Sequence, residues 1–358
     1  MRILSATEAI SPAIARTKLI LFKPFRLGRS WKFSATAYVS TMGTFFFPLP
    51  LLGLFAIPVA FRDAPHWAVW AIFGGILLLL VITVFLFILC SRLQFPFMDI
   101  VMNRSAFVAP LWRQYGPQAR RWTQAKVVIG TIAMLVLTVP LAPFIWFWLR
   151  NINNIPTANH PHPLAFPFAF FGIFFLVYAV IILIALALSL LNDFMLPPLA
   201  LEDVSIHDSW QWVVALVRAE PGQVALYALL KIVLGFVAQM ACVIVFEIIF
   251  FIVMMVIGLL SAVLAGLLHA MHVPDLIFQI ITFTLLFGFE FAFIGYFSPF
   301  SYGIPLVFLE AYKLYFLGGR YPPLGEILDR TTPPSQPLPP APQYGYVPIQ
   351  PVPPANLS

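Results

Sequence analysis

Charged residues are scarce in this chain of 358 residues: Asp, Glu, Lys and Arg make up 9% of it, whereas hydrophobic residues make up 61%. Soluble domains carry about 25% charged residues. So little charge cannot cover the surface of a water-soluble protein of this length. The composition therefore excludes an ordinary soluble domain and predicts an integral membrane protein.

Cysteines and catalytic motifs are also missing or rare. The two cysteines, Cys90 and Cys242, lie in separate apolar segments without the four-ligand spacing of a zinc site. No nucleophile elbow, P-loop, dinucleotide fingerprint or zinc-protease motif occurs in the chain. We therefore expect no disulfide, no metal site, no cofactor and no enzymatic activity.

The basic residues that are present are placed unevenly. The net charge of +6 could suggest a nucleic-acid binder, but seven of the twenty Lys and Arg precede residue 33 and six more fall in residues 92–126. Basic residues beside membrane spans mark the cytoplasmic side and attract anionic lipid headgroups. We therefore expect contacts with the bilayer and its anionic lipids, and none with nucleic acid. The predicted headgroup contacts are Arg16, Lys18, Lys23, Arg26, Arg29, Lys32, Arg120 and Arg121.

The longest apolar run covers residues 223–270. At ~1.5 Å per residue a helix of 48 residues is roughly 72 Å long, whereas the hydrocarbon core of a bilayer is ~30 Å thick. The run must cross once and then bend, lie along the surface or return. A seventh crossing would place Lys313, Arg320 and Arg330 outside, against the positive-inside rule. We therefore expect residues 250–270 to form a helical excursion on the far side, rather than a span.

The whole pattern predicts an all-α, polytopic helical bundle with interfacial amphipathic helices and both termini in the cytoplasm. Residues 1–34 should form an N-terminal interfacial amphipathic segment, opened by a capping box from Ser5 to Glu8. Residues 35–328 should form the transmembrane domain, and the Pro-rich residues 329–358 a disordered tail that could bind a protein partner. The six expected spans are 35–61, 67–91, 127–149, 164–191, 223–249 and 276–317.

Amphipathic segments precede each pair of expected spans and end near Pro24, Pro117 and Pro221. One hypothesis is three helix-plus-hairpin units, whose surface helices form a collar on the cytoplasmic face. The alternative is that any multi-span protein needs basic amphipathic linkers. The acidic residues after the fourth span should pair with the basic segment 104–126 across this face. These residues are Asp193, Glu202, Asp203 and Asp208.

Three groups of short motifs carry a family resemblance: ISPAI at 10–14 with LFKPF at 21–25, Asp193 and Phe194 with Pro197, and LEAY at 309–312. They resemble bacterial multi-span proteins related to the membrane domain found with glycerophosphodiester phosphodiesterases. The resemblance implies a helical domain in the bacterial inner membrane. It implies no activity, because the catalytic His-Arg-Gly and acidic residues of the phosphodiesterase are absent from this chain.

Ionisable residues inside a bilayer mark candidate sites, because each costs ~2.5–3.5 kcal/mol to insert. Glu290 falls near the middle of the last expected span, and Gln279 and Ser301 lie three helical turns to either side of it. Glu247 lies toward the outer end of the fifth span, and Lys231 lies near its inner end, where it can snorkel. Glu290 could serve a proton or cation relay, or be a neutral carboxyl bonded to a neighbouring helix.

Two functions follow from this map. The first is a non-enzymatic membrane component that binds lipid or partner proteins through its surface helices. The second is a transporter that uses Glu290 within a central cavity bounded by the proline-bent first and last spans. The missing catalytic sets disfavour the third possibility, an intramembrane enzyme.

Overall fold

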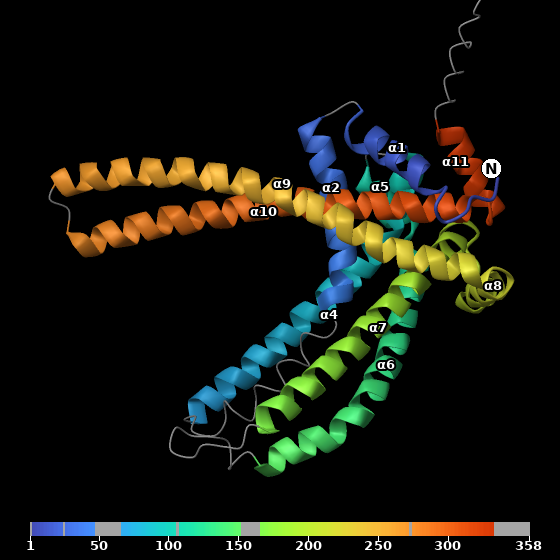
Figure 1. Cartoon of the computed structure of the whole chain (residues 1–358), viewed down its shortest axis with the longest axis horizontal. Helices are drawn as coiled ribbons and strands as arrows, with labels where there is room; N and C mark the ends of the chain where they lie inside the picture. Colours follow the sequence, from blue (N-terminus) through green and yellow to red (C-terminus); the bar gives the residue numbers. More distant parts are fainter. Residues whose placement is uncertain are drawn as a thin grey trace, which may run out of the picture.

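The computed structural model describes residues 2–23, 26–46, 66–104, 107–151, 165–271 and 274–332. Every regular element in those ranges is a helix, as expected (Figure 1). The long helices are α2 (Leu27–Phe46), α4 (His66–Asn103), α6 (Gly116–Asn151), α7 (Ala165–Leu201), α9 (Pro221–Ala270) and α10 (Asp275–Gly318). The short ones are α1 (Ile10–Leu21), α5 (Val108–Gln114), α8 (Ile206–Ala219) and α11 (Pro322–Thr331).

The predicted capping box is confirmed. The Ser5 backbone N–H donates to Glu8 Oε2 at 2.8 Å, and the Glu8 N–H donates to Ser5 Oγ at 3.3 Å. These two bonds satisfy backbone donors that the first turn leaves without partners. A turn of four residues follows, and α1 begins at Ile10.

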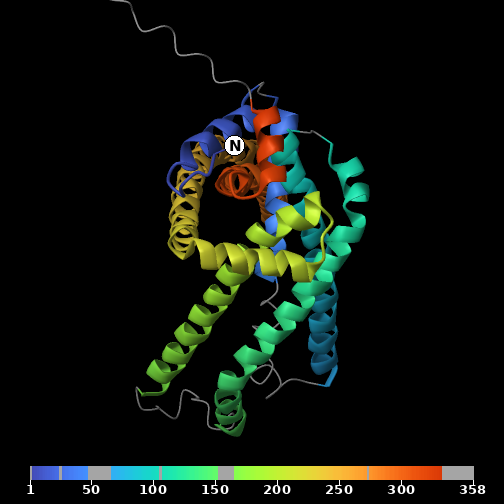
Figure 2. The same ribbon diagram turned by 90° about the vertical axis from the view of Figure 1, so that its right-hand side faces the viewer.

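The C-terminal half of α10 forms the centre of the protein. Its residues Val307, Ala311, Leu314 and Phe316 are fully buried. Helix α10 as a whole packs against α1, α2, α4, α9 and α11. Figure 2 looks along α10 and shows it with α1, α9 and α11 around it. The apolar core of the protein therefore surrounds one helix, and the short helices cover it.

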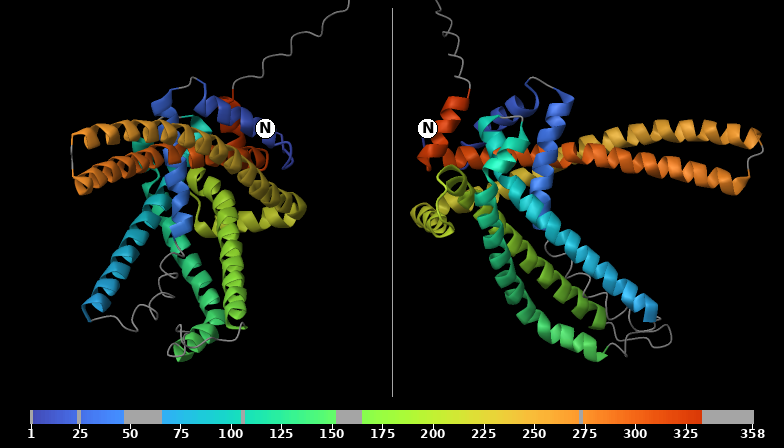
Figure 3. Two further views of the ribbon diagram at one scale, coloured as in Figure 1. Left: turned by 60° about the vertical axis from the view of Figure 1, so that its left-hand side comes forward. Right: turned by 180° about the vertical axis from the view of Figure 1, so that it is seen from behind.

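Two groups of long helices extend from this core in different directions. The distal halves of α9 and α10 project together as a hairpin, whereas α4, α6 and α7 project as a separate group (Figures 1 and 3). Within the described residues, three segments are long and apolar enough to cross a membrane: Phe73–Asn103, Pro221–Leu268 and Gln279–Gly318. In the most apolar 18-residue window of each segment, only 11%, 0% and 6% of the residues are buried, which is the arrangement expected of surfaces that face lipid.

Several helices run further than the expected membrane spans. No break separates residues 250–270 from the fifth span, because α9 runs through 50 residues without an internal proline. Helix α4 continues past Pro96 to Asn103, and α7 continues past Pro197 and Pro198 to Leu201. The added turns are buried in the core, where packing holds the helices beyond the expected membrane limits. The C-terminal half of the first expected span, residues 47–61, lies outside the described residues.

Arg16 does not face lipid headgroups, so this part of the prediction is wrong. Its side chain is 1% exposed. Arg16 Nε donates to the Val101 carbonyl at 3.2 Å, and Nη1 donates to the Thr331 carbonyl at 3.1 Å. Burial lowers the pKa of this guanidinium. The last carbonyls of a helix have no donor within that helix. Arg16 supplies donors to such carbonyls of α4 and α11, and so connects both helices to α1.

The other predicted headgroup contacts lie at the surface. Arg29 and Arg121 are half-buried, and Arg121 pairs with Asp203. The remaining five are exposed: Lys18, Lys23, Arg26, Lys32 and Arg120. The expected tail also begins later than predicted, because α11 includes residues 329–331 and Thr332 caps it. Residues 333–358 lie outside the described residues.

Candidate functional site: a polar chamber between the helices

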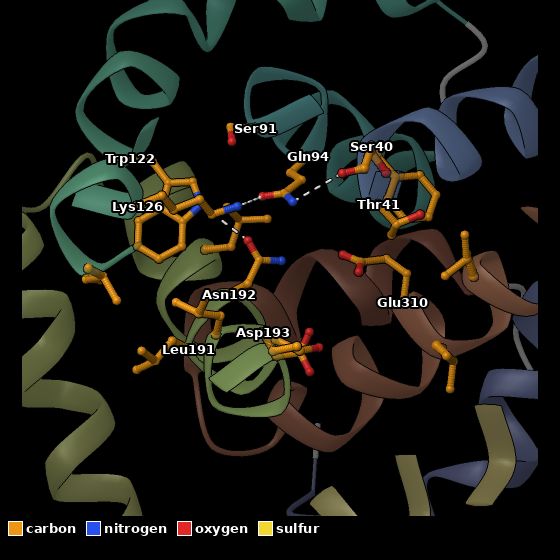
Figure 4. Close-up of a pocket in the computed structure, with 18 of the residues that line it drawn as sticks. Ser40, Thr41, Ser91, Gln94, Trp122, Lys126, Leu191, Asn192, Asp193 and Glu310 are labelled. Carbon is orange, nitrogen blue, oxygen red and sulfur yellow. Dashed lines mark hydrogen bonds between the residues drawn. The ribbon is translucent and has the colours of Figure 1, made fainter. Parts of the chain in front are cut away.

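A chamber of about 290 Å³ lies where α2, α4, α6, α7, α9 and α10 meet (Figure 4). Four charged side chains line it: Lys126, Asp193, Lys231 and Glu310. Neutral polar side chains lie between them, among them Ser40, Ser91, Gln94, Ser189 and Asn192. So many polar groups inside an apolar bundle must be paired with one another or with a ligand.

Asp193 and Lys231 form one ion pair across α7 and α9. Lys231 Nζ donates to Asp193 Oδ2 and, at 2.8 Å, to Ser189 Oγ. The Tyr227 hydroxyl donates to the same Asp193 oxygen at 2.9 Å. The two charged side chains are 7% and 14% exposed. This carboxylate is therefore neutralised by its own lysine and further held by a buried tyrosine.

Glu310 forms a second ion pair within α10, with Lys313 one turn later. Glu310 lines the chamber, whereas Lys313 is 1% exposed and lies outside the chamber lining. An ion pair between neighbouring turns of one helix forms without constraint from other helices. Lys313, which lies outside the chamber lining, therefore balances the negative charge of Glu310 at the chamber wall.

Lys126 differs from both pairs. Its Nζ donates to Gln94 Oε1, and Gln94 Nε2 donates to the Ser40 carbonyl at 3.2 Å. Lys126 Nζ also lies 5.1 Å from the ring centroid of Trp122. Over the described part of the chain, no carboxylate lies within ion-pair distance of Lys126.

The chamber changes from polar to apolar along the helix axes. Phe87 precedes Gln94 on α4, Ile129 follows Lys126 on α6, and Leu188 precedes Asp193 on α7. Helix α6 runs outward from the core, whereas α4 and α7 run toward it (Figure 1). All three apolar residues therefore lie on the distal side of the charged ones, toward the free ends of the projecting helices.

Comparison with known proteins places the whole of this architecture in one family. A family of unknown function, DUF7544, matches residues 4–327. This chain belongs to the DUF7544 family. No curated protein and no solved structure matches it. The match reaches from the capping box before α1 into α11, so the chamber lies within the family domain. The resemblance to the phosphodiesterase-associated membrane domain stays a prediction.

The residues predicted for an intramembrane site do not meet in this DUF7544 protein. Lys231 lines the chamber, but Glu290, Gln279 and Glu247 do not. Gln279 and Glu247 are exposed on the distal hairpin, and Ser301 is buried, its carbonyl 3.4 Å from Gln239 Nε2. Although Gln279, Glu290 and Ser301 share α10, they extend over roughly 33 Å of it. One helix stripe of that length is not one site.

Glu290 lies on the side of α10 that packs against α9. It is half-buried one turn before Phe293, whose ring lies 5.7 Å from that of Phe246 and 5.4 Å from that of Phe250. Its surroundings on that face are aromatic and apolar. Of the two interpretations of Glu290, this position favours packing against the neighbouring helix.

Four acidic residues were expected to pair with the basic segment 104–126, and the structure shows this pairing for one of them. Asp203 pairs with Arg121, as predicted. Asp208 instead accepts a bond from the Ser205 hydroxyl at 2.7 Å at the start of α8. The prediction that Asp193 lies in a cytoplasmic surface segment is wrong, because α7 continues ten residues beyond the expected end of the span. Glu202 lies near Tyr321: burial raises the pKa of the Tyr321 hydroxyl, and the charge of Glu202 raises it further.

Sequence reasoning missed Lys126, Asp193 and Glu310 as members of one site. A signal was available, because each lies at the inner end of an expected span and Asp193 and Glu310 belong to the motifs that carry the family resemblance. Charges at span ends usually face water, so this position alone did not distinguish them. Among the described residues, no group of three or more His, Cys, Asp and Glu side chains could hold a metal ion.

Proposed function

We propose that this member of DUF7544 is a non-enzymatic component of the bacterial inner membrane that binds a membrane lipid in the chamber. The observation that carries the proposal is the chamber itself, whose distal end is apolar and whose charged groups lie further in, toward the core. A lipid has the same division between headgroup and acyl chain. Binding sites for such molecules are concave, mainly apolar and contain a few fixed polar groups.

The proposal includes six membrane spans with the core at the cytoplasmic side. The three segments long and apolar enough to cross a membrane lie in α4, α9 and α10. The proposal adds three further spans, which include parts of α2, α6 and α7. The exposed basic residues of α1, α2 and the start of α6 support this orientation, because lysine and arginine stay on the cytoplasmic side. Both termini would then be cytoplasmic.

Labelling of single cysteines would test the orientation. In a background with Cys90 and Cys242 replaced by serine and alanine, a cysteine at exposed Gln114 in α5 should react only after the cells are permeabilised. A cysteine at Met271, which is 73% exposed after α9, should react in intact cells. Labelling of Gln114→Cys from outside would refute the map.

Transport through Glu290 has less support than lipid binding. Glu290 does not line the chamber, which instead contains Glu310 five turns further along α10. Partner binding through the Pro-rich tail depends on residues outside the described part of the chain and stays a prediction. Lipid binding is therefore the function that the chamber supports best.

Native mass spectrometry of protein extracted in a mild detergent would test lipid binding. We expect wild-type protein to retain lipid at a stoichiometry that survives detergent exchange. Ala185→Phe should remove that retention, because Ala185 lines the apolar end and a phenyl ring would fill it. The matched control is Ile182→Phe on the same helix, where the side chain is 49% exposed outside the chamber. Equal retention in both variants would contradict the proposal.

A further inference from the structure

The charges around the chamber do not cancel. Three lysines, Lys126, Lys231 and Lys313, lie at or behind its wall with two carboxylates, Asp193 and Glu310. Each carboxylate already has its own lysine at ion-pair distance. One positive charge therefore remains, and it is on Lys126. An unpaired charge away from water is costly, so the group must lose its proton or gain an anion.

The groups around Lys126 are arranged for an ammonium ion. The Gln94 amide is fixed by its bond to the Ser40 carbonyl, so its oxygen faces Lys126 Nζ. The Trp122 ring presents its π-system at 5.1 Å, a contact that attracts a cation and gives little to a neutral amine. Both contacts favour the charged form without neutralising it.

A second donor lies beside Lys126. Asn192 accepts a bond from Trp122 Nε1 on its Oδ1 at 3.2 Å, which leaves the amide nitrogen available to donate. In the view of Figure 4 that nitrogen points away from Trp122, toward the side of the chamber on which Glu310 lies. An ammonium and an amide N–H converging on one space are suited to an oxygen-bearing anion.

We propose that Lys126 and Asn192 form a site for the oxyanion, phosphate or carboxylate, of an amphipathic molecule with one net negative charge. This inference rests on the proposed lipid-binding function and specifies its ligand class. The acyl part lies toward Phe87, Ile129 and Leu188, on the distal side of Lys126. Glu310 faces the same space, but Lys313 balances it, so the ligand needs no positive group.

Competition between lipids on the wild-type protein tests the charge of the ligand. The delipidated protein receives equal amounts of dioleoyl phosphatidylglycerol, dioleoyl phosphatidylethanolamine and monoolein, and native mass spectrometry counts what is retained. We expect the anionic phosphatidylglycerol to be retained in preference to the zwitterionic and the uncharged lipid. A parallel titration with inorganic phosphate alone separates a lipid headgroup from a free anion.

Variants of Lys126 assign the preference to this residue. Lys126→Gln should lower the retention of phosphatidylglycerol roughly tenfold or more, because a charge-assisted bond is lost. Lys126→Arg should keep the preference, since it keeps the charge. The matched control is Arg113→Gln, which removes an exposed basic residue of α5 outside the predicted headgroup contacts and should leave retention unchanged. If Lys126→Gln does not fold, the competition on the wild-type protein still tests whether the ligand is anionic.

The outcomes separate this inference from the proposed function. Equal retention of all three lipids, abolished by Ala185→Phe, would overturn the oxyanion site and leave lipid binding intact. Binding of inorganic phosphate that depends on Lys126, without retained lipid, would support the oxyanion site and refute lipid binding. Retention of phosphatidylglycerol that is the same in Lys126→Gln and wild type would place the bound lipid elsewhere and overturn the inference.

Discussion

The two halves of α10 have similar apolar compositions and opposite surroundings. In residues 301–318, Val307, Ala311 and Phe316 are fully buried against protein, whereas in residues 275–300 Phe283 and Phe291 are 67% and 71% exposed. The difference shows that hydrophobicity alone does not tell a lipid-facing surface from a protein core. Polar side chains of the inner half form contacts within the core: Glu310 pairs with Lys313, and the Tyr312 hydroxyl donates to the Ala6 carbonyl at 3.0 Å.

Glycine substitutions should produce the largest contrast between the halves. A Cβ at Gly303 would lie 2.2 Å from the Ser34 backbone carbonyl oxygen, whereas a Cβ at Gly295 would meet nothing within 4 Å. Backbone cannot yield as a flexible side chain can, so we expect Gly303→Leu to cost about 3 kcal/mol or more. Gly295→Leu should be close to neutral. Thermal unfolding in detergent measures both.

Equal unfolding temperatures for the two glycine variants would show that α2 and α10 do not approach at Gly303. A drop confined to Gly303→Leu would show that the close packing of the inner half persists outside a bilayer. Gel filtration of each variant would establish that the compared proteins are monodisperse.

Charge substitutions should produce a contrast of similar size. Lys231→Met removes the partner of buried Asp193, and leaving one charge of a buried pair alone costs about 3–5 kcal/mol. Glu290→Gln changes a half-buried residue of the distal hairpin and should alter stability little. The unfolding temperature of each variant, measured at neutral pH, gives the comparison.

The double variant Lys231→Met with Asp193→Asn should recover part of the lost stability, because it removes the unpaired carboxylate. Were Glu290→Gln as damaging as Lys231→Met, the distal hairpin would contain a polar contact as important as those of the core. The contrast between the two regions would then fail.

The smallest effect should come from the capping box, which is exposed at the surface of the core. The backbone N–H and hydroxyl of Ser5 hold the pKa of Glu8 below its usual value. The folded state therefore favours the carboxylate, and its stabilisation is complete above the pKa of about 4.3 in the unfolded chain. It is lost as the pH falls through the lower folded value. Unfolding temperatures of wild type and Glu8→Gln should thus differ slightly at pH 7 and converge in acid. A difference independent of pH would be inconsistent with this mechanism.

The sequence predicted where a helix begins or ends wherever it contains a local start or stop signal. The capping box at Ser5, the break before Gly116 and the last helix from Asp275 to Gly318 agree with the expectation within a residue or two. The expected span limits at residues 91 and 191 were set by membrane thickness, and the helices themselves run on to Asn103 and Leu201. The helices continue there because the next turns are packed between other helices.

The candidate site was less predictable than the helices. Lys231 and Asp193 are 38 residues apart in the chain, and Lys126 and Gln94 are 32 apart. Such pairs have no periodic signature, since they depend on how α4, α6, α7 and α9 meet. Arg16 illustrates the same limit: its spacing on α1 is that of a surface residue, but its partners come from α4 and α11.

By itself, the sequence determined that this protein is helical, that its helices are long and apolar enough for a membrane, and that its cations gather at one end of them. These properties are sums over neighbouring residues, so they can be read along the chain. Only the tertiary structure decided that Asp193 pairs with Lys231 and that Lys126 is left over. That outcome depends on distances between side chains from different helices, because electrostatic and hydrogen-bond energies act through space.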